Sequence, residues 1–265
     1  MTSAPHRLVL TAGEFAYLVE RTGVDLPPAW RPSADIGPAE AGLIKKRVVD
    51  GVGGELHRSV IKNLEILALP MVMLDTVAAI DGKGLHSMHA ISGPLGASLF
   101  ELGDNAVEMS MFASADLGRE LIRAVPPESQ DTNAGIESRL GGGGPEQAPL
   151  RGRLPLAALQ EMGAARLFRD ADPGGPAAVV ARLRLSGDEA ALAQQVATET
   201  DGALRCFVVG RNGMASQVSW VHTDGGWSGL DPEPDGSGRR IVRLEPADRE
   251  DLGTWVAPAV AGALA

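Results

Sequence analysis

The stretch Leu204-Arg-Cys-Phe-Val-Val-Gly210 decides the fold, because this run of strand-forming residues leads directly into the turn Arg211-Asn212-Gly213. An Asn-Gly pair accepts the positive φ angles of a type I′ turn, so these residues predict a β-hairpin. The returning strand, Gln217-Val-Ser-Trp-Val-His222, alternates along its length, which places Val218 and Trp220 on the same face of the sheet.

Two further strands and a helix are expected to continue from this hairpin. Asp224-Gly-Gly226 predicts a turn into a strand at residues 227–230, and residues 239–244 predict a fourth strand after a loop. The segment Glu245-Pro-Ala-Asp248 then predicts a helix with Pro246 in its first turn, where acidic residues face the positive end of the helix dipole. The region is therefore predicted to be a four-stranded antiparallel meander that feeds a helix.

The same order of segments occurs earlier in the chain. Strands are expected at residues 71–79, 85–92, 95–102 and 106–112. The residues Asp81, Gly82, Lys83 and Gly84 predict a turn after the first of them, and Ser114 is expected to cap the helix that follows the last. Because residues 111–116 and 243–248 both run from a strand end through a cap into Ala-Asp and a helix, one fold unit is predicted to occur twice.

The chain is expected to form one domain from two halves. Residues 1–125 and 151–265 each combine helices with a meander, and residues 126–150 are rich in Gly, Ser, Gln and Pro and predict a flexible linker. The predicted fold class is α+β, with a central, mainly antiparallel sheet from the two meanders, flanked by helical bundles. Thr11 and Glu14 form a capping-box pattern at the first helix.

The composition narrows the possible functions. A formal net charge of −10 argues against a nucleic-acid partner, which calls for Lys and Arg concentrated on one face. The single cysteine, Cys206, permits no internal disulfide and suits a reducing compartment. No apolar run approaches the ~20 residues of a membrane span, and no signal-peptide core is recognised. A cytoplasmic protein without membrane insertion is expected.

No convergent catalytic or metal-binding set is visible. His86 and His89 are three residues apart in an expected strand, so they face opposite sides and cannot share one ion without a bulge. Cys206 lies inside an expected central strand, where a free thiol is usually a small buried hydrophobe. No G-x-S-x-G or H-E-x-x-H motif occurs. The sequence therefore predicts no catalytic residue, no metal site and no cofactor.

Two interpretations of the second meander remain open. Trp220, His222 and Trp227 stand close together in the sequence and could form a recognition face, or they could pack beneath the helices, which is preferred for Trp220. A different class of function is a small-molecule-binding or enzymatic domain with a cleft between the halves, using Arg211, His222 and Asp224 as polar groups. The two classes differ in whether these three groups converge in one pocket.

The chain resembles the EspG family, the cytosolic substrate chaperones of actinobacterial type VII (ESX) secretion. The resemblance rests on the order and spacing of a few stretches over nearly the whole chain. These are the opening Leu8-Val-Leu-Thr-Ala-Gly-Glu-Phe15, the helix leading into residues 71–79, the segment from Val218 to Trp227 with its Asp-Gly-Gly turn, and the closing Val242-Arg-Leu-Glu-Pro-Ala-Asp248.

The resemblance implies a quasi-two-fold α+β fold and a non-enzymatic function. A protein similar to this family binds the apolar helical tip of a PE–PPE-like heterodimer, or of another helical substrate such as a WXG-type protein, and keeps it soluble in the cytosol. It is expected to be a monomer or a weak dimer. The family's contacts come from the sheet, from a loop that corresponds here to residues 81–84, and from the C-terminal helical region. The residues expected to contact the partner are Asp81, Gly82, Lys83, Gly84, Arg211, Asn212, His222 and Trp227.

Overall fold

The computed structural model describes residues 6–51, 53–103, 105–127, 148–166, 174–234, 238 and 240–265. Its strands form one ten-stranded sheet in the order β1-β5-β4-β3-β2-β7-β8-β9-β10-β6, and every neighbouring pair is antiparallel. The strands are β1 His6–Thr11, β2 Val72–Ile80, β3 Lys83–Ser92, β4 Leu95–Leu102, β5 Ala106–Ala113, β6 Gly152–Pro155, β7 Gly202–Gly210, β8 Ala215–Thr223, β9 Gly226–Pro234 and β10 Arg240–Pro246. This sheet and its flanking helices confirm the predicted α+β class.

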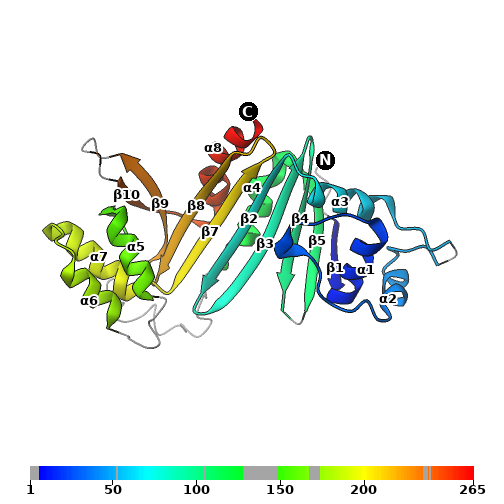
Figure 1. The fold of residues 1–265 in the computed structure, drawn as a ribbon, viewed down its shortest axis with the longest axis horizontal. Coiled ribbons are helices and arrows are strands. Elements are labelled where there is room, and N and C mark those ends of the chain that lie inside the picture. Colours follow the sequence, from blue (N-terminus) through cyan, green and yellow to red (C-terminus); the bar gives the residue numbers. More distant parts are fainter. Residues whose placement is uncertain are drawn as a thin grey trace, which may run out of the picture.

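The two halves of the chain meet at the centre of the sheet, where β2 pairs with β7 along its whole length, from Val72 opposite Gly210 to Ile80 opposite Gly202. Read outward from this pair, the first half runs β2-β3-β4-β5-β1 and the second runs β7-β8-β9-β10-β6 (Figure 1). The order and direction of the strands are therefore the same in both halves. Whether the two units superpose, and whether residues 1–125 and 151–265 act as separate halves, stay predictions.

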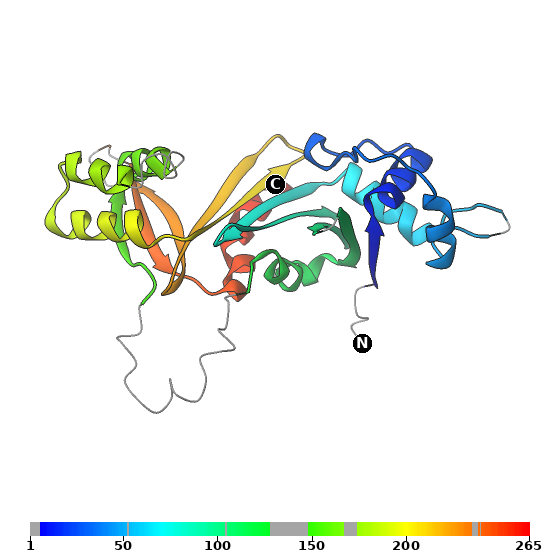
Figure 2. The ribbon, with the colours of Figure 1, turned by 90° about the horizontal axis from the view of Figure 1, so that it is seen from below.

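The helices cover different parts of the two faces of the sheet. They are α1 Ala12–Thr22, η1 Pro28–Trp30, α2 Ala39–Lys45, α3 Arg58–Ala68, η2 Ser114–Asp116, α4 Leu117–Leu121, η3 Ile122–Ala124, α5 Leu156–Arg166, α6 Gly175–Arg182, α7 Gly187–Glu199, η5 Arg249–Asp251 and α8 Leu252–Leu264. Figure 2 shows α4 and α8 on one face of the sheet, in the middle, and the groups α1–α3 and α5–α7 on the other side at its two ends.

Three apolar cores follow from this arrangement. The central core lies between the sheet and α4 and α8, and it takes residues from both halves, for example Leu74 and Leu121 from the first and Leu204 and Trp220 from the second. A second core fills the space under α1–α3, and a third fills the space under α5–α7. The central core therefore joins the halves, whereas the other two each belong to one half.

Both hairpin turns of the central strands differ from their predicted forms. At the β2–β3 hairpin, Asp81 and Gly82 alone make the turn, with φ angles of 50° and 75°, while Lys83 and Gly84 already belong to β3. Two consecutive positive φ angles are the mark of a type I′ turn. At the β7–β8 hairpin only Gly213 has a positive φ, 83°, so the predicted type I′ turn is wrong there.

The second hairpin turn is a three-residue loop instead. The N–H of Gly213 donates to the carbonyl of Gly210 at 3.0 Å, and the N–H of Gly210 donates to the carbonyl of Met214 at 2.8 Å. This is the pattern of a type I turn followed by a left-handed glycine. The side chain of Asn212 helps to close this loop, because its Oδ1 accepts the N–H of Met214 at 3.0 Å.

The expected helix starts are confirmed at one place and wrong at two. Thr11 Oγ1 accepts the N–H of Glu14 at 3.2 Å, and Glu14 Oε2 accepts the N–H of Thr11 at 2.8 Å, which is the predicted capping box. Ser114 opens the 3₁₀ turn η2 without capping it, and the α-helix α4 starts only at Leu117. Pro246 ends β10 opposite Ser228, and the turn before α8 starts only after Asp248. The predicted linker lies mostly outside the described residues.

Candidate functional site

The middle of the sheet has one face that none of the described helices covers. On β2 and β7 the side chains alternate: Leu74 and Cys206 are 0% exposed, whereas Val77, Phe207 and Val209 are 46%, 42% and 36% exposed. Because successive side chains of a strand point to opposite faces, all three exposed residues lie on the face opposite α4 and α8. We call this surface, formed by residues 77, 79, 203, 205, 207, 209, 215, 217 and 219, the central face.

The two outer groups of helices leave the central face bare. Helices α1 and α3 contact β3, β4 and β5, and helices α5 and α7 contact β6 and β10, so neither group lies over β2 and β7. Figure 1 shows the central strands running between these two groups of helices, with α8 and α4 behind the sheet. The central face is therefore the part of the sheet surface that lies between the two groups of helices.

A cluster of polar and aromatic side chains borders the central face on the side of the first half. The side chain of Asp75 lies opposite Phe207 in the pairing of β2 with β7. Its Oδ1 accepts a hydrogen bond from Trp30 Nε1 at 3.0 Å and lies 3.0 Å from His86 Nε2. The rings of Trp30 and His86 stack at 4.2 Å, and His86 Nδ1 lies 3.3 Å from Glu101 Oε1. Asp75 thus fixes η1 on the sheet beside the exposed apolar residues.

The charges in this cluster stabilise one another. The hydrogen bond to Asp75 raises the pKa of His86 above its usual 6.5, and the charges of Asp75 and Glu101 act in the same direction against partial burial. Burial would raise the pKa of Asp75, but the hydrogen bonds from His86 and Trp30 outweigh it and lower that pKa below its usual 3.8. His86 is therefore positively charged between two carboxylates over a wider pH range than an isolated histidine.

Polar side chains also lie within the central face. Arg205 is exposed in the middle of β7, opposite Val77 of β2 and opposite Ser219 of β8, and Gln217 Nε2 donates to Ser219 Oγ at 2.6 Å. Apolar and polar side chains therefore alternate across this surface. The thiol of Cys206 faces the other side of the sheet, and burial raises its pKa to about 11, so it is not a nucleophile for this surface.

The turn residues predicted to contact a partner do not lie together. The turn at Asp81 follows Ile80, which pairs with Gly202, whereas the turn at Arg211 follows Gly210, which pairs with Val72. The turns thus lie at opposite ends of nine-residue strands, and eight steps of about 3.4 Å put them roughly 27 Å apart. Residues 81–84 are exposed, so their contact with a partner stays a prediction.

Arg211 and Asn212 hold the end of the central strands together. Arg211 Nη2 donates to the carbonyl of Leu69 at 3.1 Å, its N–H donates to the carbonyl of Met71 at 2.9 Å, and Asn212 Nδ2 donates to the carbonyl of Gly262 at 3.1 Å. These bonds join the β7–β8 turn to the entrance of β2 and to the end of α8. The structure gives both residues a structural role, and their contact with a partner stays a prediction.

His222 and Trp227 lie on the covered face of the sheet. Trp227 is 1% exposed and His222 is 7% exposed, and their rings meet edge-on at 4.9 Å. His222 Nδ1 lies 2.7 Å from Asp201 Oδ1. Trp220 is buried in the same core, as expected. The strand pairing turns all three rings toward α8, so the structure does not offer His222 and Trp227 as a recognition face.

The three polar groups of the alternative small-molecule interpretation do not converge. His222 pairs with Gly202 at one end of β7, and Asp224 follows in the adjoining turn. Arg211 lies at the other end of the same strand. His86 and His89 face opposite sides, as predicted, since His86 contacts Asp75 whereas His89 packs edge-on against Phe100 in the interior.

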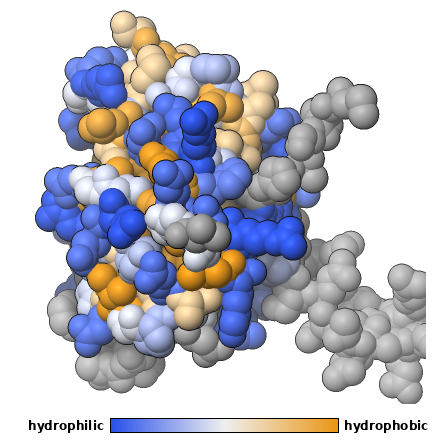
Figure 3. All heavy atoms as spheres, turned by 90° about the vertical axis from the view of Figure 1, so that its right-hand side faces the viewer, coloured by the Kyte–Doolittle hydropathy of each residue, from blue (hydrophilic) through white to orange (hydrophobic). Residues whose placement is uncertain are grey.

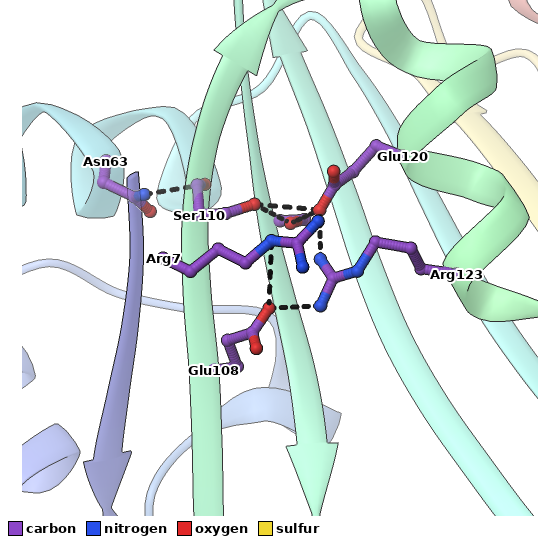
Figure 4. A network of polar contacts seen from close by, with 7 residues as sticks. Arg7, Asn63, Glu108, Ser110, Glu120 and Arg123 are labelled. Carbon is purple, nitrogen blue, oxygen red and sulfur yellow. Dashed lines mark hydrogen bonds and ion pairs between the residues drawn. The ribbon is translucent and has the colours of Figure 1, made fainter. Parts of the chain in front are cut away.

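A buried polar network lies between the sheet and α4 (Figure 4). Glu120 is 4% exposed, and its Oε1 accepts hydrogen bonds from Ser98 and Ser110 at 2.9 Å and pairs with Arg123, which also pairs with Glu108. Burial would raise the pKa of Glu120, but Arg123 and the two hydroxyl groups lower it below its usual value. The carboxylate is ionised and fully engaged, so the network ties α4 to β4 and β5.

Two classes of site are absent from the described part of the chain. No group of three or more His, Cys, Asp or Glu side chains there is arranged to hold a metal ion. Among the same residues, no helix is long and apolar enough to cross a bilayer.

Sequence reasoning missed the residues that define the central face. In the sequence, the exposed residues of this surface lie within apolar strands: Val77, Phe207 and Val209. No local sequence pattern shows that the helices on one side of the sheet end before they cover these residues. Trp30 and Asp75 lie 45 residues apart, and no periodic pattern connects them. The signal that was available is the charged Arg205 within an otherwise apolar strand, which marks one face of β7 as exposed.

Comparisons with known proteins agree with this geometry at the level of the fold. No protein-family profile matches the chain, and no curated protein matches its sequence. Among solved structures, the chain is similar to the Mycobacterium tuberculosis type VII secretion system chaperone EspG5, solved in complex with a PE25-PPE41 dimer. The TM-score is 0.62 at 14% sequence identity, over 95% of this chain and 94% of the other. The chain therefore has the fold of the EspG secretion chaperones, as the resemblance in its sequence predicts.

Proposed function

We propose that this protein is a non-enzymatic chaperone that binds the apolar helical tip of a type VII secretion substrate on the central face. The observation that carries the proposal is the group of exposed apolar side chains on the central face, between the two groups of helices: Val77, Phe207 and Val209. Isolated exposed apolar residues are ordinary, but three on adjoining strands form a surface that a partner can cover. The fold shared with EspG5 supports the same function.

The chemistry of the central face suits a helical tip better than a small molecule. The surface is an open sheet face on which Val77, Phe207 and Val209 alternate with the polar side chains of Asp75, Arg205 and Gln217. A tip with a few apolar side chains would cover Phe207 while its polar groups met these polar neighbours. The client is a PE–PPE-like heterodimer or a WXG-type protein, and the complex forms in the cytosol with a monomeric or weakly dimeric chaperone.

The affinity should allow later release of the client. A complex that must dissociate before export is expected to have a Kd near micromolar or somewhat lower, which corresponds to about −8 to −10 kcal/mol. Because packing supplies most of this free energy, the affinity should depend only mildly on salt. Replacing Lys83 by Ala in the β2–β3 hairpin should cost less than ~1 kcal/mol of binding free energy, because its side chain is at the exposed rim.

The test is co-expression with the PE/PPE-like or WXG-type proteins encoded nearby, followed by size-exclusion chromatography. The wild-type chain should co-elute with one of them, and Phe207→Asp should abolish co-elution because it replaces the largest exposed apolar side chain of the central face by a charge. Val9→Asp is the matched control, since Val9 is 47% exposed but lies on the outermost strand β1. Equal co-elution of both variants, or no co-elution with any neighbour, contradicts the proposal.

A further inference from the structure

A cavity of about 610 Å³ lies at the outer end of the first half, separated from β2 by three strands. Its apolar walls come from β1, β5 and α3 and include Leu8, Val60 and Met109. Figure 3 faces this end of the molecule and shows apolar side chains interrupted everywhere by hydrophilic ones. The cavity is therefore a local apolar recess and not part of a wide apolar docking surface.

The charged groups of this cavity are all cationic. Its lining includes Arg7, Lys46 and Arg47 and no Asp or Glu, although acidic residues outnumber Lys and Arg by 34 to 24 in the whole chain. The Nε atom of Arg7 lies 3.9 Å from Glu108 Oε1, so this guanidinium has a carboxylate partner (Figure 4). Lys46 Nζ contacts Glu14 Oε2 at 2.5 Å and the carbonyl of Val9 at 2.9 Å. Arg47 is thus the cation of the lining that no described carboxylate neutralises.

The backbone of Arg47 makes this residue unusual. The N–H of Arg47 donates to the carbonyl of Ile44, and the N–H of Val48 donates to the carbonyl of Leu43, both at 2.9 Å. These two bonds form a Schellman motif at the end of α2, in which Arg47 holds the left-handed position with φ 58°. Glycine takes that position most easily, because a side chain there is strained. An arginine at this position is therefore expected to stabilise the fold less than glycine would.

His57 adds a hydrogen-bond donor to the same cavity. It is the N-cap of α3, and its Nδ1 accepts the N–H of Ser59 at 3.3 Å. Since Nδ1 is the acceptor, the proton of the neutral ring is on Nε2, which is free to donate. The positive end of the α3 dipole lies at the same residue and also favours an anion. A cationic side chain, an N–H donor and a helix N-terminus therefore meet beside apolar walls.

We propose that this cavity binds an organic oxyanion, a phosphate or carboxylate group carried on a compact apolar body. The oxyanion would pair with Arg47 and accept a hydrogen bond from His57, while the apolar body would fill the recess lined by Leu8, Val60 and Met109. The site is independent of the proposed client surface, because β3, β4 and β5 lie between β1 and β2.

The test is isothermal titration calorimetry of the full chain with four probes. Octyl phosphate and octanoate carry both parts of the proposed ligand, inorganic phosphate carries the head group alone, and octan-1-ol carries the apolar part alone. At least one of the two amphipathic anions should bind with one-to-one stoichiometry and at least tenfold more tightly than either single-part probe, and the tighter of the two identifies the head group. No saturable binding of either amphipathic anion overturns the proposal.

The variant Arg47→Gly separates a binding role from a structural one. It removes the cation and relieves the left-handed strain, so the affinity should fall at least tenfold while the thermal midpoint stays equal or rises. Arg184→Gly is the matched control, because Arg184 is exposed in the other half of the chain, and it should leave the affinity unchanged. A lower thermal midpoint with unchanged affinity for Arg47→Gly would show a purely structural residue and overturn the proposal.

Discussion

His86 shows how a single side chain can set the shape of the surface beside the central face. Its ring stacks on Trp30 while its two nitrogens contact Asp75 and Glu101. Trp30 belongs to η1 and is also buried in the second core. The position of η1 beside β2 therefore depends in part on a contact whose strength changes with the charge of one imidazole.

Replacing His86 by Phe should destabilise the fold more at pH 6 than at pH 8.5. The folded-state pKa of His86 is raised, so its stabilising contribution is complete below the unfolded value near 6.5 and is lost as the pH rises through the folded value. Asp75 remains ionised throughout this range because its pKa is lowered. We expect a loss of about 1 kcal/mol in the free energy of unfolding at pH 6, and less at pH 8.5. Urea unfolding followed by tryptophan fluorescence measures both values.

A second variant controls for the loss of ring packing. Glu101→Gln leaves the ring of His86 in place and removes one of its two carboxylate neighbours, so the midpoint of the pH dependence should move to lower pH. If His86→Phe costs the same free energy at both pH values, the contact depends on packing alone and the charge has no part in it.

At the scale of single residues, the sequence predicts the strands but not that one face of the central strands is left uncovered by helices. Phe207 is 42% exposed and its neighbour Cys206 is fully buried, although both lie in one apolar run. The pleat predicts that they face opposite ways, and Arg205 shows which side meets water. That side is bare only because helices from distant parts of the chain end before they reach it, which is a property of tertiary packing.

Helix α8 illustrates the role of a close contact between elements. It packs on β7 and β8, and Trp255 lies over Gly229 of β9. A Cβ atom at Gly229 would come within 2.3 Å of the Trp255 ring. The ring also meets Trp220 edge-on at 6.1 Å, so the glycine allows an aromatic cluster to join the helix to the sheet.

Replacing Gly229 by Ala should displace Trp255 and loosen α8. Overpacking of this kind typically costs about 1–3 kcal/mol, and here the added methyl group meets a rigid ring. Chemical denaturation measures the loss, and near-UV circular dichroism should show a weaker tryptophan signal. Gly163→Ala in α5 is the control, because its added Cβ meets nothing within 4 Å and alanine favours a helix. Equal stability of Gly229→Ala and wild type would contradict the close contact.

Among the elements, local signals predicted the start of α1, which depends only on neighbouring residues. The capping box at Thr11 and the left-handed Gly23 depend only on nearby residues, and both were predictable. The expected helix at Pro246 was wrong because β10 is held by β9 as far as Ser228. Pairing of β10 with β6 has already ended at Leu244, so a proline without an N–H is tolerated there.

At the scale of the whole molecule, the two halves form one sheet and share one core. The strand order is the same in both halves when read outward from β2 and β7. This agreement supports the predicted duplication, and superposition of the two sets of five strands on each other is the comparison that tests it. Strands in matching positions that fail to overlap would contradict a common unit.

A chain divided between residues 127 and 148 should fold only when both pieces are present. Separated, the first piece would expose β2 and the second would expose β7, and each would also lose half of the central core, such as Leu74 or Leu204. Long apolar edge strands aggregate, so each piece expressed alone should be insoluble or lack a cooperative transition. Co-expressed, fragments 1–127 and 148–265 should co-purify in equal amounts and unfold in a single transition close to that of the intact chain, which is the control. Cooperative unfolding of either fragment by itself would show that its half has a sufficient core of its own, and that the β2–β7 pairing is an interface between independent domains.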